Sequence, residues 1–167
     1  MPTLYDITVP AFIRGLSNMA AFLEKGRAYA AEQGWAESAL TEARLYEDMA
    51  PLTSQIQRAT DSAKFVAVRV GGVENKSFAD EEVTFADLQQ RIAATIDFLN
   101  AAPREGFDGK DDAEVIVKTP SRDIKFTGRD YIIGFALPNF YFHMTAAYAL
   151  LRSKGVPVGK MDFLGGV

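Results

Sequence analysis

The chain has 167 residues, of which 48% are hydrophobic and 24% are charged, and it contains no cysteine. This length suits one compact domain with a sizeable core, so we predict a single domain over residues 1–167. The formal net charge of −4 gives no attraction to phosphate backbones, and we expect no nucleic-acid partner. Without cysteine the chain can form no disulfide, thiolate nucleophile or cysteine metal site. This composition suits a reducing compartment, and we expect a cytoplasmic protein.

The first half of the chain predicts two helical regions. Apolar and small residues at three-four spacing favour a helix over residues 4–33, with Gly34 as its C-terminal cap. No basic stretch leads into an apolar run before it, so no signal peptide is expected. A second helical region begins near Thr41, is broken at Pro51, and continues with an apolar seam to Val70.

A third helix is predicted to begin after Thr84, because Asp87 stands three residues later and completes a capping box. The acidic cluster of residues 80–82 lies just before it, where carboxylates would stabilise the positive end of the helix dipole. The alternative is a metal site. We favour the helix-end interpretation, because adjacent carboxylates cannot all face one ion.

Two short β-rich runs over residues 114–119 and 124–127 flank a proline turn and predict a hairpin. A fourth helix is expected over residues 129–154, with a bend at Pro138 and an end at Gly155. The following tail contains Phe163 and Leu164, which we expect to pack on the bundle. The predicted fold class is therefore mainly all-α, a four-helix bundle with a small β-hairpin before the last helix.

Residues 131–151 carry no formal charge and are long enough to cross a bilayer. The run nevertheless contains Pro138, Asn139 and His143, and a polar group at the centre of a bilayer needs partners from neighbouring helices. Since no second hydrophobic segment of that length exists, we interpret the run as a buried bundle helix and expect no membrane association.

His143 is the only histidine and the first candidate for function. It could be a metal ligand, a general base or an orienting donor, or a core residue bonded to an amide or a carbonyl. A zinc site needs three or four nitrogen, sulfur or oxygen ligands, whereas this chain offers one histidine and no cysteine. If a metal binds, His143 is the only ligand that can be named.

Asp48 and Gln55 lie seven residues apart, nearly in register on a helix, and could both point toward His143. Alternatively, Asp48 caps the helix that follows Pro51. Tyr141 and Tyr148 are also seven apart, and their hydroxyl groups need partners if they are buried, although aromatic residues at this spacing are more often core. No glycine-rich phosphate loop and no Gly-x-Ser-x-Gly motif is present.

The segment from Ala136 to His143, continuing to Arg152 and through Gly159 to Gly165, resembles an uncharacterised bacterial domain-of-unknown-function family. This family is placed among the DinB/YfiT-like four-helix-bundle proteins. Asp48-Met-x-Pro-Leu52 with Gln55, and the stretch from Phe78 to Ile92, support the resemblance over the whole chain. It implies a bundle of four main helices that often forms a homodimer.

The wider superfamily resembles a set of metalloenzymes, among them thiol-dependent transferases and isomerases, with a metal held by three histidines. Two of those usually stand four residues apart, but here Asn139 and Ala147 flank His143 at that distance. We therefore expect a small-ligand-binding or interaction module with a degenerate site and no cofactor. The alternatives are a bound divalent metal, and a DinB-like enzyme, such as a thiol transferase, that uses His143 with metal or acid–base chemistry. The candidate pocket residues are His143, Gln55, Asp48, Tyr148, Asn139 and Tyr141.

Overall fold

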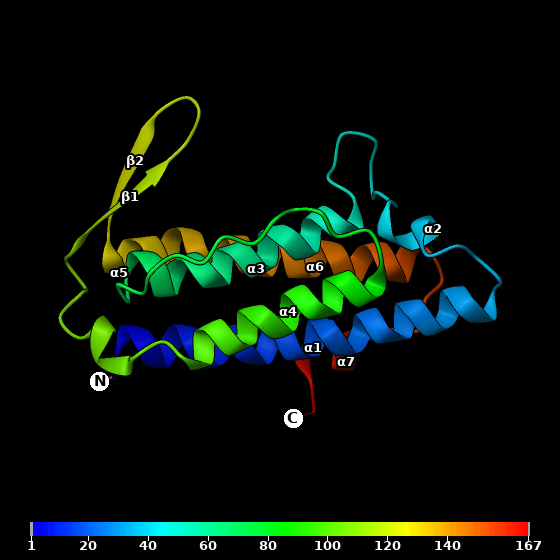
Figure 1. Ribbon diagram of the computed structural model, residues 1–167, viewed down its shortest axis with the longest axis horizontal. Helices are drawn as coiled ribbons and strands as arrows, with labels where there is room; N and C mark the ends of the chain where they lie inside the picture. Colours follow the sequence, from blue (N-terminus) through cyan, green and yellow to red (C-terminus); the bar gives the residue numbers. More distant parts are fainter. Residues whose placement is uncertain (1, 167) are drawn as a thin grey trace.

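The computed structural model describes residues 2–166, which form a mainly helical bundle. Its four long helices are α1 (Leu4–Glu32), α3 (Leu52–Arg69), α4 (Phe85–Asn100) and α6 (Leu137–Ser153). They run along the long axis of the molecule, and the hairpin projects from one end (Figure 1). α3 packs between α4 and α6, and α1 closes the bundle on the other side of both. The predicted mainly α fold with a hairpin before the last long helix is confirmed.

One hydrophobic core lies between the four helices. Leu16 of α1, Ile56 of α3 and Leu88 of α4 are fully buried in it. Phe12 packs edge-to-face on Phe140 with 4.9 Å between the ring centroids. α1 and α6 can approach this closely because residue 15 is glycine, where a Cβ atom would lie 2.7 Å from the Phe140 ring. The core thus sets the distance between α1 and α6.

Both α1 and α4 begin with a capping box. In it, the hydroxyl of a threonine accepts from the backbone amide of an aspartate three residues later, and the carboxylate of that aspartate accepts from the backbone amide of the threonine. Thr3 and Asp6 form the box of α1, and Thr84 and Asp87 form that of α4. The predicted start of α4 is therefore confirmed. α1 ends at Glu32, one residue before the predicted end, with Gly34 in the left-handed conformation (φ 68°) just beyond it.

The predicted helix from Thr41 to Pro51 is wrong. The short helix α2 (Ser38–Thr41) ends where that helix should begin, and residues 42–51 form turns and irregular structure. The residue before a proline is pushed out of the helical region, and Pro51 itself has no N–H to donate. The loop closes when the Leu52 amide donates to the Ala43 carbonyl, and α3 starts only there.

The predicted last helix is divided into three parts. α5 (Gly128–Tyr131) leads into one π-helical turn, η2 (Ile132–Ala136), and then into α6. Pro138 lies in the first turn of α6. Residue 138 cannot donate an α-helical hydrogen bond to the carbonyl of residue 134, because proline has no N–H. The wider π turn is located where this hydrogen bond is missing. The irregularity expected as a bend at Pro138 is therefore a π turn directly before it.

The hairpin and the packing of the tail match the sequence prediction, whereas a short helical element in the predicted loop 101–113 and another in the tail were not predicted. β1 (Glu114–Lys118) and β2 (Asp123–Thr127) form the antiparallel hairpin, and η1 (Arg104–Phe107) precedes them. The tail forms α7 (Lys160–Leu164) and packs on α1, where Asn18 donates to the Phe163 carbonyl at 3.1 Å. Within residues 2–166, no helix has the length and apolar character needed to cross a membrane.

Replacing Thr84 by alanine removes the acceptor for the Asp87 amide at the start of α4. Loss of such a cap costs about 1 kcal/mol of unfolding free energy. Urea unfolding of Thr84→Ala should show this loss, while Val83→Ala, which truncates an exposed side chain one residue earlier, should change stability by less than about 0.5 kcal/mol. Equal stability of wild type and Thr84→Ala would contradict the capping role.

Candidate functional site

A row of polar contacts runs along the seam between α3 and the last helical segment. Gln55, Ser62 and Arg69 are seven residues apart, so they share one face of α3 at intervals of about 10 Å. Each bonds to a residue of α6 or α5 on the opposite side. We name these three contacts the polar ladder: His143 Nδ1 to Gln55 Oε1 at 2.8 Å, Asn139 Nδ2 to Ser62 Oγ at 2.7 Å, and Arg69 Nη1 to the Tyr131 hydroxyl at 3.0 Å.

The first contact of the polar ladder determines which nitrogen of His143 carries the hydrogen. The amide nitrogen of Gln55 donates to the Ala50 carbonyl at 2.9 Å, which turns its oxygen toward the imidazole. An amide oxygen can only accept, so Nδ1 must be the donor. In the neutral ring Nε2 then keeps its lone pair as an acceptor.

His143 is neutral near pH 7. Its side chain is buried, with 7% of the residue's surface exposed. Burial, followed by the positive charge of Arg58, lowers the pKa of His143 from its ordinary value of 6.5 to about 4. Among the described residues no buried side-chain nitrogen or oxygen lacks a partner, and Nε2 makes no hydrogen bond within the protein, so Nε2 reaches solvent.

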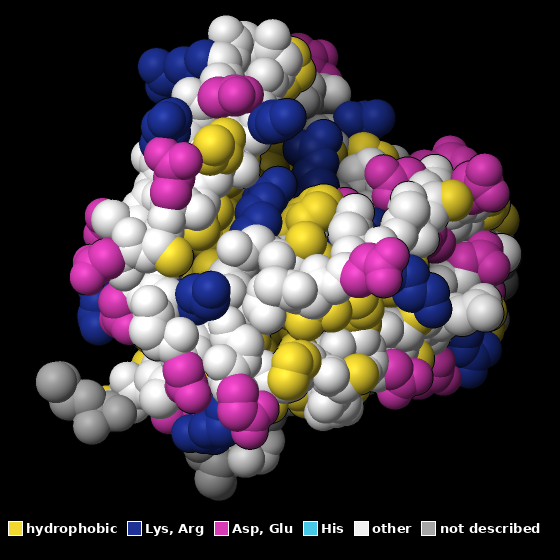
Figure 2. Space-filling model, turned by 60° about the vertical axis from the view of Figure 1, so that its left-hand side comes forward, with side chains coloured by type: hydrophobic (Ala, Val, Ile, Leu, Met, Phe, Trp, Pro, Cys, Tyr) yellow, Lys and Arg dark blue, Asp and Glu magenta, His cyan; other side chains and the backbone are white. Residues whose placement is uncertain are grey.

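His143 lines a hollow of about 240 Å³ between α3, α5, α6, η2 and β1, and Nε2 is its ring nitrogen without a partner among the described residues. We name this cavity the His143 hollow. At the end of the molecule that carries the hairpin, basic side chains gather beside hydrophobic ones around a depression (Figure 2). The residues that line the hollow are Arg58, Asp61, Ser62, Phe65, Arg69, Val117, Tyr131, Phe135, Ala136, Asn139 and His143.

The structure brings together three of the six candidate residues. Gln55, Asn139 and His143 all belong to the polar ladder, and the predicted meeting of Gln55 with His143 is confirmed. Asp48 is exposed in the loop before α3, and no side chain caps that helix, so the capping alternative for Asp48 is also wrong.

Tyr141 and Tyr148 lie on other sides of α6. Successive residues of an α-helix are rotated by about 100° about its axis. Tyr141, two residues before His143, and Tyr148, five residues after it, therefore point well away from the histidine. Tyr141 is 39% exposed and lines a different hollow together with Asn18 of α1. The Tyr148 ring packs edge-to-face on Phe22 and Phe163.

Sequence reasoning missed Arg58, Ser62, Arg69 and Tyr131 as parts of the site. The seven-residue spacing of Gln55, Ser62 and Arg69 was a signal that could have identified the α3 side of the polar ladder. Tyr131 had no such signal, because its position depends on α5, η2 and the way that they dock on α3.

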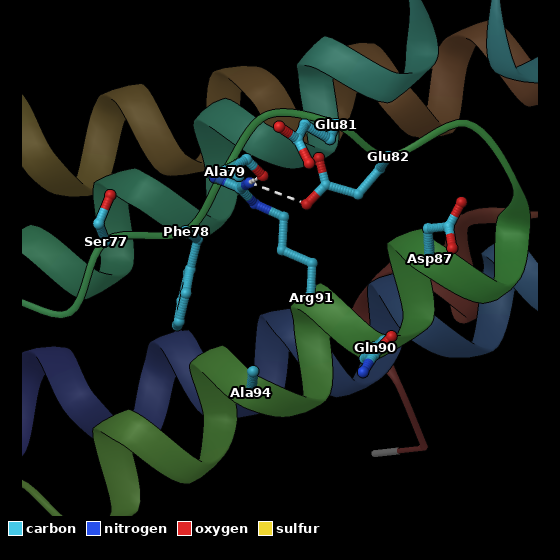
Figure 3. A pocket seen from close by; sticks show the side chains of 9 residues that line it. All are labelled: Ser77, Phe78, Ala79, Glu81, Glu82, Asp87, Gln90, Arg91 and Ala94. Atoms are coloured by element: carbon cyan, nitrogen blue, oxygen red, sulfur yellow. Dashed lines mark hydrogen bonds and ion pairs between the residues drawn. The ribbon is translucent and has the colours of Figure 1, made fainter.

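A second hollow, of about 450 Å³, lies between α4 and the segment that precedes it (Figure 3). Arg91 rises from α4 into its wall and is 4% exposed. The guanidinium donates to Glu82 and Asp80 at 2.9 Å, and to Asp61 of α3 at 3.1 Å. Asp80 and Glu82 therefore pair with Arg91, and the expectation that the acidic cluster serves the start of α4 is corrected.

We name Arg91 with Asp61, Asp80 and Glu82 the Arg91 cluster. It joins α3, α4 and the segment that precedes α4. Burial alone would raise the pKa of Glu82, but hydrogen bonds from Gln57 and Arg91 outweigh it and hold the pKa below the ordinary value of 4.5. The resulting stabilisation is present above pH 4.5 and is lost as the pH falls through the lowered pKa. Because every partner of Arg91 is engaged, we assign the cluster a structural role, fastening residues 79–82 across α3 and α4.

The model of a family described as "Domain of unknown function (DUF1993)" matches residues 4–164. The chain belongs to this family. It is also similar to a solved structure described as a DinB family member protein from Shewanella denitrificans. The two share 36% sequence identity with a TM-score of 0.90, over 98% of this chain and 93% of the other. No curated protein matches this chain. The resemblance to a DinB-like family of unknown function is confirmed.

The donor atoms in this DUF1993 chain do not fit the three-histidine metal site that the DinB resemblance implies. Within residues 2–166, no group of three or more histidine, cysteine, aspartate or glutamate side chains is placed to hold a metal ion. The ladder partners nearest to His143 are the neutral amides of Gln55 and Asn139 and the hydroxyl of Ser62. Neutral amide and hydroxyl groups are weak ligands for zinc, so no step is assigned to a metal here.

NMR of protein labelled with ¹⁵N-histidine should show one imidazole in the Nδ1–H form, because the chain has a single histidine. It should stay neutral down to about pH 5, since burial and Arg58 lower its pKa to about 4. Gln55→Leu, which removes the acceptor, should abolish the preference for Nδ1–H. An Nε2–H tautomer in the wild type would contradict the assignment.

The same pKa shift predicts a pH-dependent stability. As the pH falls from 6.5 to 4, the unfolded chain takes up a proton on this histidine before the folded protein does, so unfolding becomes easier. The loss amounts to about 3 kcal/mol across this window. His143→Phe, which cannot titrate, is the matched control and should lack this part of the pH dependence in urea unfolding.

Arg91→Met should lower the unfolding free energy by about 3 to 5 kcal/mol, because it leaves the buried carboxylate of Glu82 without its cationic partner and removes one of the two cations that pair with Asp61. Arg27→Met is the matched control. Arg27 forms an exposed ion pair with Glu24, and its removal should cost less than about 1 kcal/mol. Similar losses in the two variants would show that the Arg91 cluster does not fasten the fold.

Proposed function

We propose that this DUF1993 protein is a small-molecule-binding module whose site is the His143 hollow. The observation that carries the proposal is the accessible Nε2 of His143, a neutral acceptor whose orientation is fixed by Gln55. Binding sites typically combine an apolar concave surface with a few polar groups held in place in advance. The polar ladder supplies such groups along one wall of the hollow.

The size and walls of the hollow favour a small ligand with an apolar or aromatic part. Its volume of about 240 Å³ equals the share of about eight water molecules in the liquid. Half-buried rings of Phe65 and Phe135 line it, and Val117 of β1 contributes a further apolar surface. Flat rings between such side chains gain contact on both faces.

The chemistry of Nε2 favours binding over proton abstraction. A general base works best when its pKa lies near the working pH, whereas the pKa of His143 is lowered to about 4. A weakly basic acceptor still binds an O–H or N–H group of a ligand, and it does so without changing its own charge. We therefore propose that the ligand presents a hydrogen-bond donor to Nε2.

A DinB-like enzyme that uses His143 in acid–base chemistry is the second candidate. One observation favours it: an imidazole with one nitrogen fixed by hydrogen bonding and the other open to a cavity is also the arrangement of a catalytic histidine. This candidate requires that a bound substrate raise the pKa of His143 toward neutrality. Asp48 lies in the exposed loop before α3, so it does not assist His143 in this structure.

The homodimer and the cytoplasmic location stay predictions. Exposed Phe142 of α6 is a large hydrophobic side chain that a second copy would cover. Sedimentation of the wild type and of Phe142→Ser measures whether a dimer forms and whether this surface is used.

Phenol, which has an aromatic ring and one O–H donor, tests the proposed function. In titrations followed by the ¹⁵N signals of His143, phenol should bind with a Kd of about 1 mM and shift Nε2 more than Nδ1. Anisole has the same ring but no O–H, so it should bind several-fold more weakly. The His143→Phe variant keeps a ring of similar size without the acceptor and should remove the preference for phenol, measured by ligand-observed NMR. No response of His143 to either compound at 20 mM would refute the proposal.

A further inference from the structure

Arg69 is held in place by neutral groups. Its guanidinium donates to the Tyr131 hydroxyl at 3.0 Å, and it lies 4.3 Å from the centre of the Phe65 ring and 5.6 Å from that of Tyr131. No carboxylate among residues 2–166 forms an ion pair with it. The guanidinium is thus oriented in advance, and its charge is not neutralised.

The His143 hollow as a whole has an excess of positive charge. Arg58 lines it and, like Arg69, forms no ion pair within the described chain. The only carboxylate in the lining is Asp61, which is engaged by Arg91 at 3.1 Å and Lys64 at 3.5 Å. An anion that enters the hollow would therefore meet two cations and no free carboxylate.

The hydrogen-bonding groups of the hollow are also divided between its two ends. At one end Tyr131 accepts from Arg69, and no described protein group accepts the hydrogen of its own hydroxyl. Burial raises the pKa of Tyr131, so this hydroxyl stays protonated. Toward the other end, His143 Nε2 and, at the middle contact of the polar ladder, the amide oxygen of Asn139 accept no hydrogen bond from a described residue. One end thus offers the donors of Arg69 and Tyr131, and the other offers acceptors beside the exposed guanidinium of Arg58.

The distance between these ends indicates an elongated ligand. The side chain of Arg69 leans back over Phe65, one helical turn closer to the His143 end than its own Cα. Phe65 and Arg58 are seven residues apart on α3, a rise of about 10 Å. The protein groups at the two ends of the hollow are therefore on the order of 10 Å apart, and a ligand bridges them through one hydrogen bond at each end, so its own anionic group and donor lie closer together than this.

We infer that the ligand is a small monocarboxylate with an aromatic or apolar body, whose carboxylate binds Arg69 and whose far end carries a hydrogen-bond donor for His143. This inference rests on the proposed function, since it names the class of ligand for the same hollow. Guanidinium groups suit planar carboxylates, to which they can donate two parallel hydrogen bonds. The aromatic walls formed by Phe65 and Phe135 hold the body between the two ends.

The experiment compares 4-hydroxyphenylacetate with 4-hydroxyphenylacetamide, which has nearly the same shape but no charge. Binding is measured by the ¹⁵N signals of His143 and by calorimetry at 50 mM NaCl. Wild type should bind the acid at least tenfold more tightly than the amide. Raising NaCl to 500 mM should weaken the acid several-fold and leave the amide unchanged, a test that needs no variant.

Arg69→Gln should bring the acid-to-amide affinity ratio close to one without weakening the amide, and Arg69→Lys should retain part of the ratio. Arg122→Gln is the matched control, because it removes the same charge from an exposed site in the hairpin turn and should leave the ratio unchanged. Far-UV circular dichroism checks that each variant is folded. Loss of the acid preference in Arg122→Gln to the same degree would overturn the role of Arg69.

The two proposals fail in different ways. Equal binding of acid and amide by the wild type would overturn the carboxylate inference and leave the ligand-binding function standing. If neither compound shifts the His143 signals while phenol does, the carboxylate inference is also overturned. If phenol fails as well, the proposed function itself is refuted.

Discussion

The packing of α3 on α6 imposes the constraint on which the site depends: a polar side chain on this seam must find its partner on the opposite helix. Leaving a buried polar group unpaired costs about 1 to 3 kcal/mol, and no buried side-chain nitrogen or oxygen of the described residues is left so. Gln55 satisfies both ends of its amide, by accepting from His143 on α6 and donating to Ala50 in the loop before α3. One amide thereby orders the loop before α3 and determines the tautomer of the histidine.

The polar ladder and the Arg91 cluster use opposite faces of α3 for different purposes. Around Arg91 every charge is matched, and the result is a fastening between α3, α4 and residues 79–82. In the His143 hollow the charges of Arg58 and Arg69 stay unmatched, and Nε2 of His143 has no protein partner. Asp61 connects the two regions, because it lines the hollow while it binds Arg91. The matched region stabilises the fold, and the unmatched one is where we propose that a ligand binds.

Most of the fold could be predicted from the sequence because its signals are local. The capping box at Thr84 and Asp87, the hairpin and the end at Gly155 each depend on residues a few positions apart. The prediction failed over residues 42–51, where the loop closes through a bond between Leu52 and Ala43. The acidic cluster was assigned to the nearest helix end, whereas its partner is the side chain of Arg91 about ten residues later.

The sequence by itself determined that a single histidine lies in an uncharged stretch of a bundle helix and that no second histidine stands four residues away. Tertiary structure alone decided its partner, the state of its two nitrogens and the cavity that it faces. It also separated Asp48, Tyr141 and Tyr148 from the site. The physical reason is that tautomer, pKa and pocket charge arise from groups on other elements, and sequence spacing says nothing about their distance in space until α3 docks on α6.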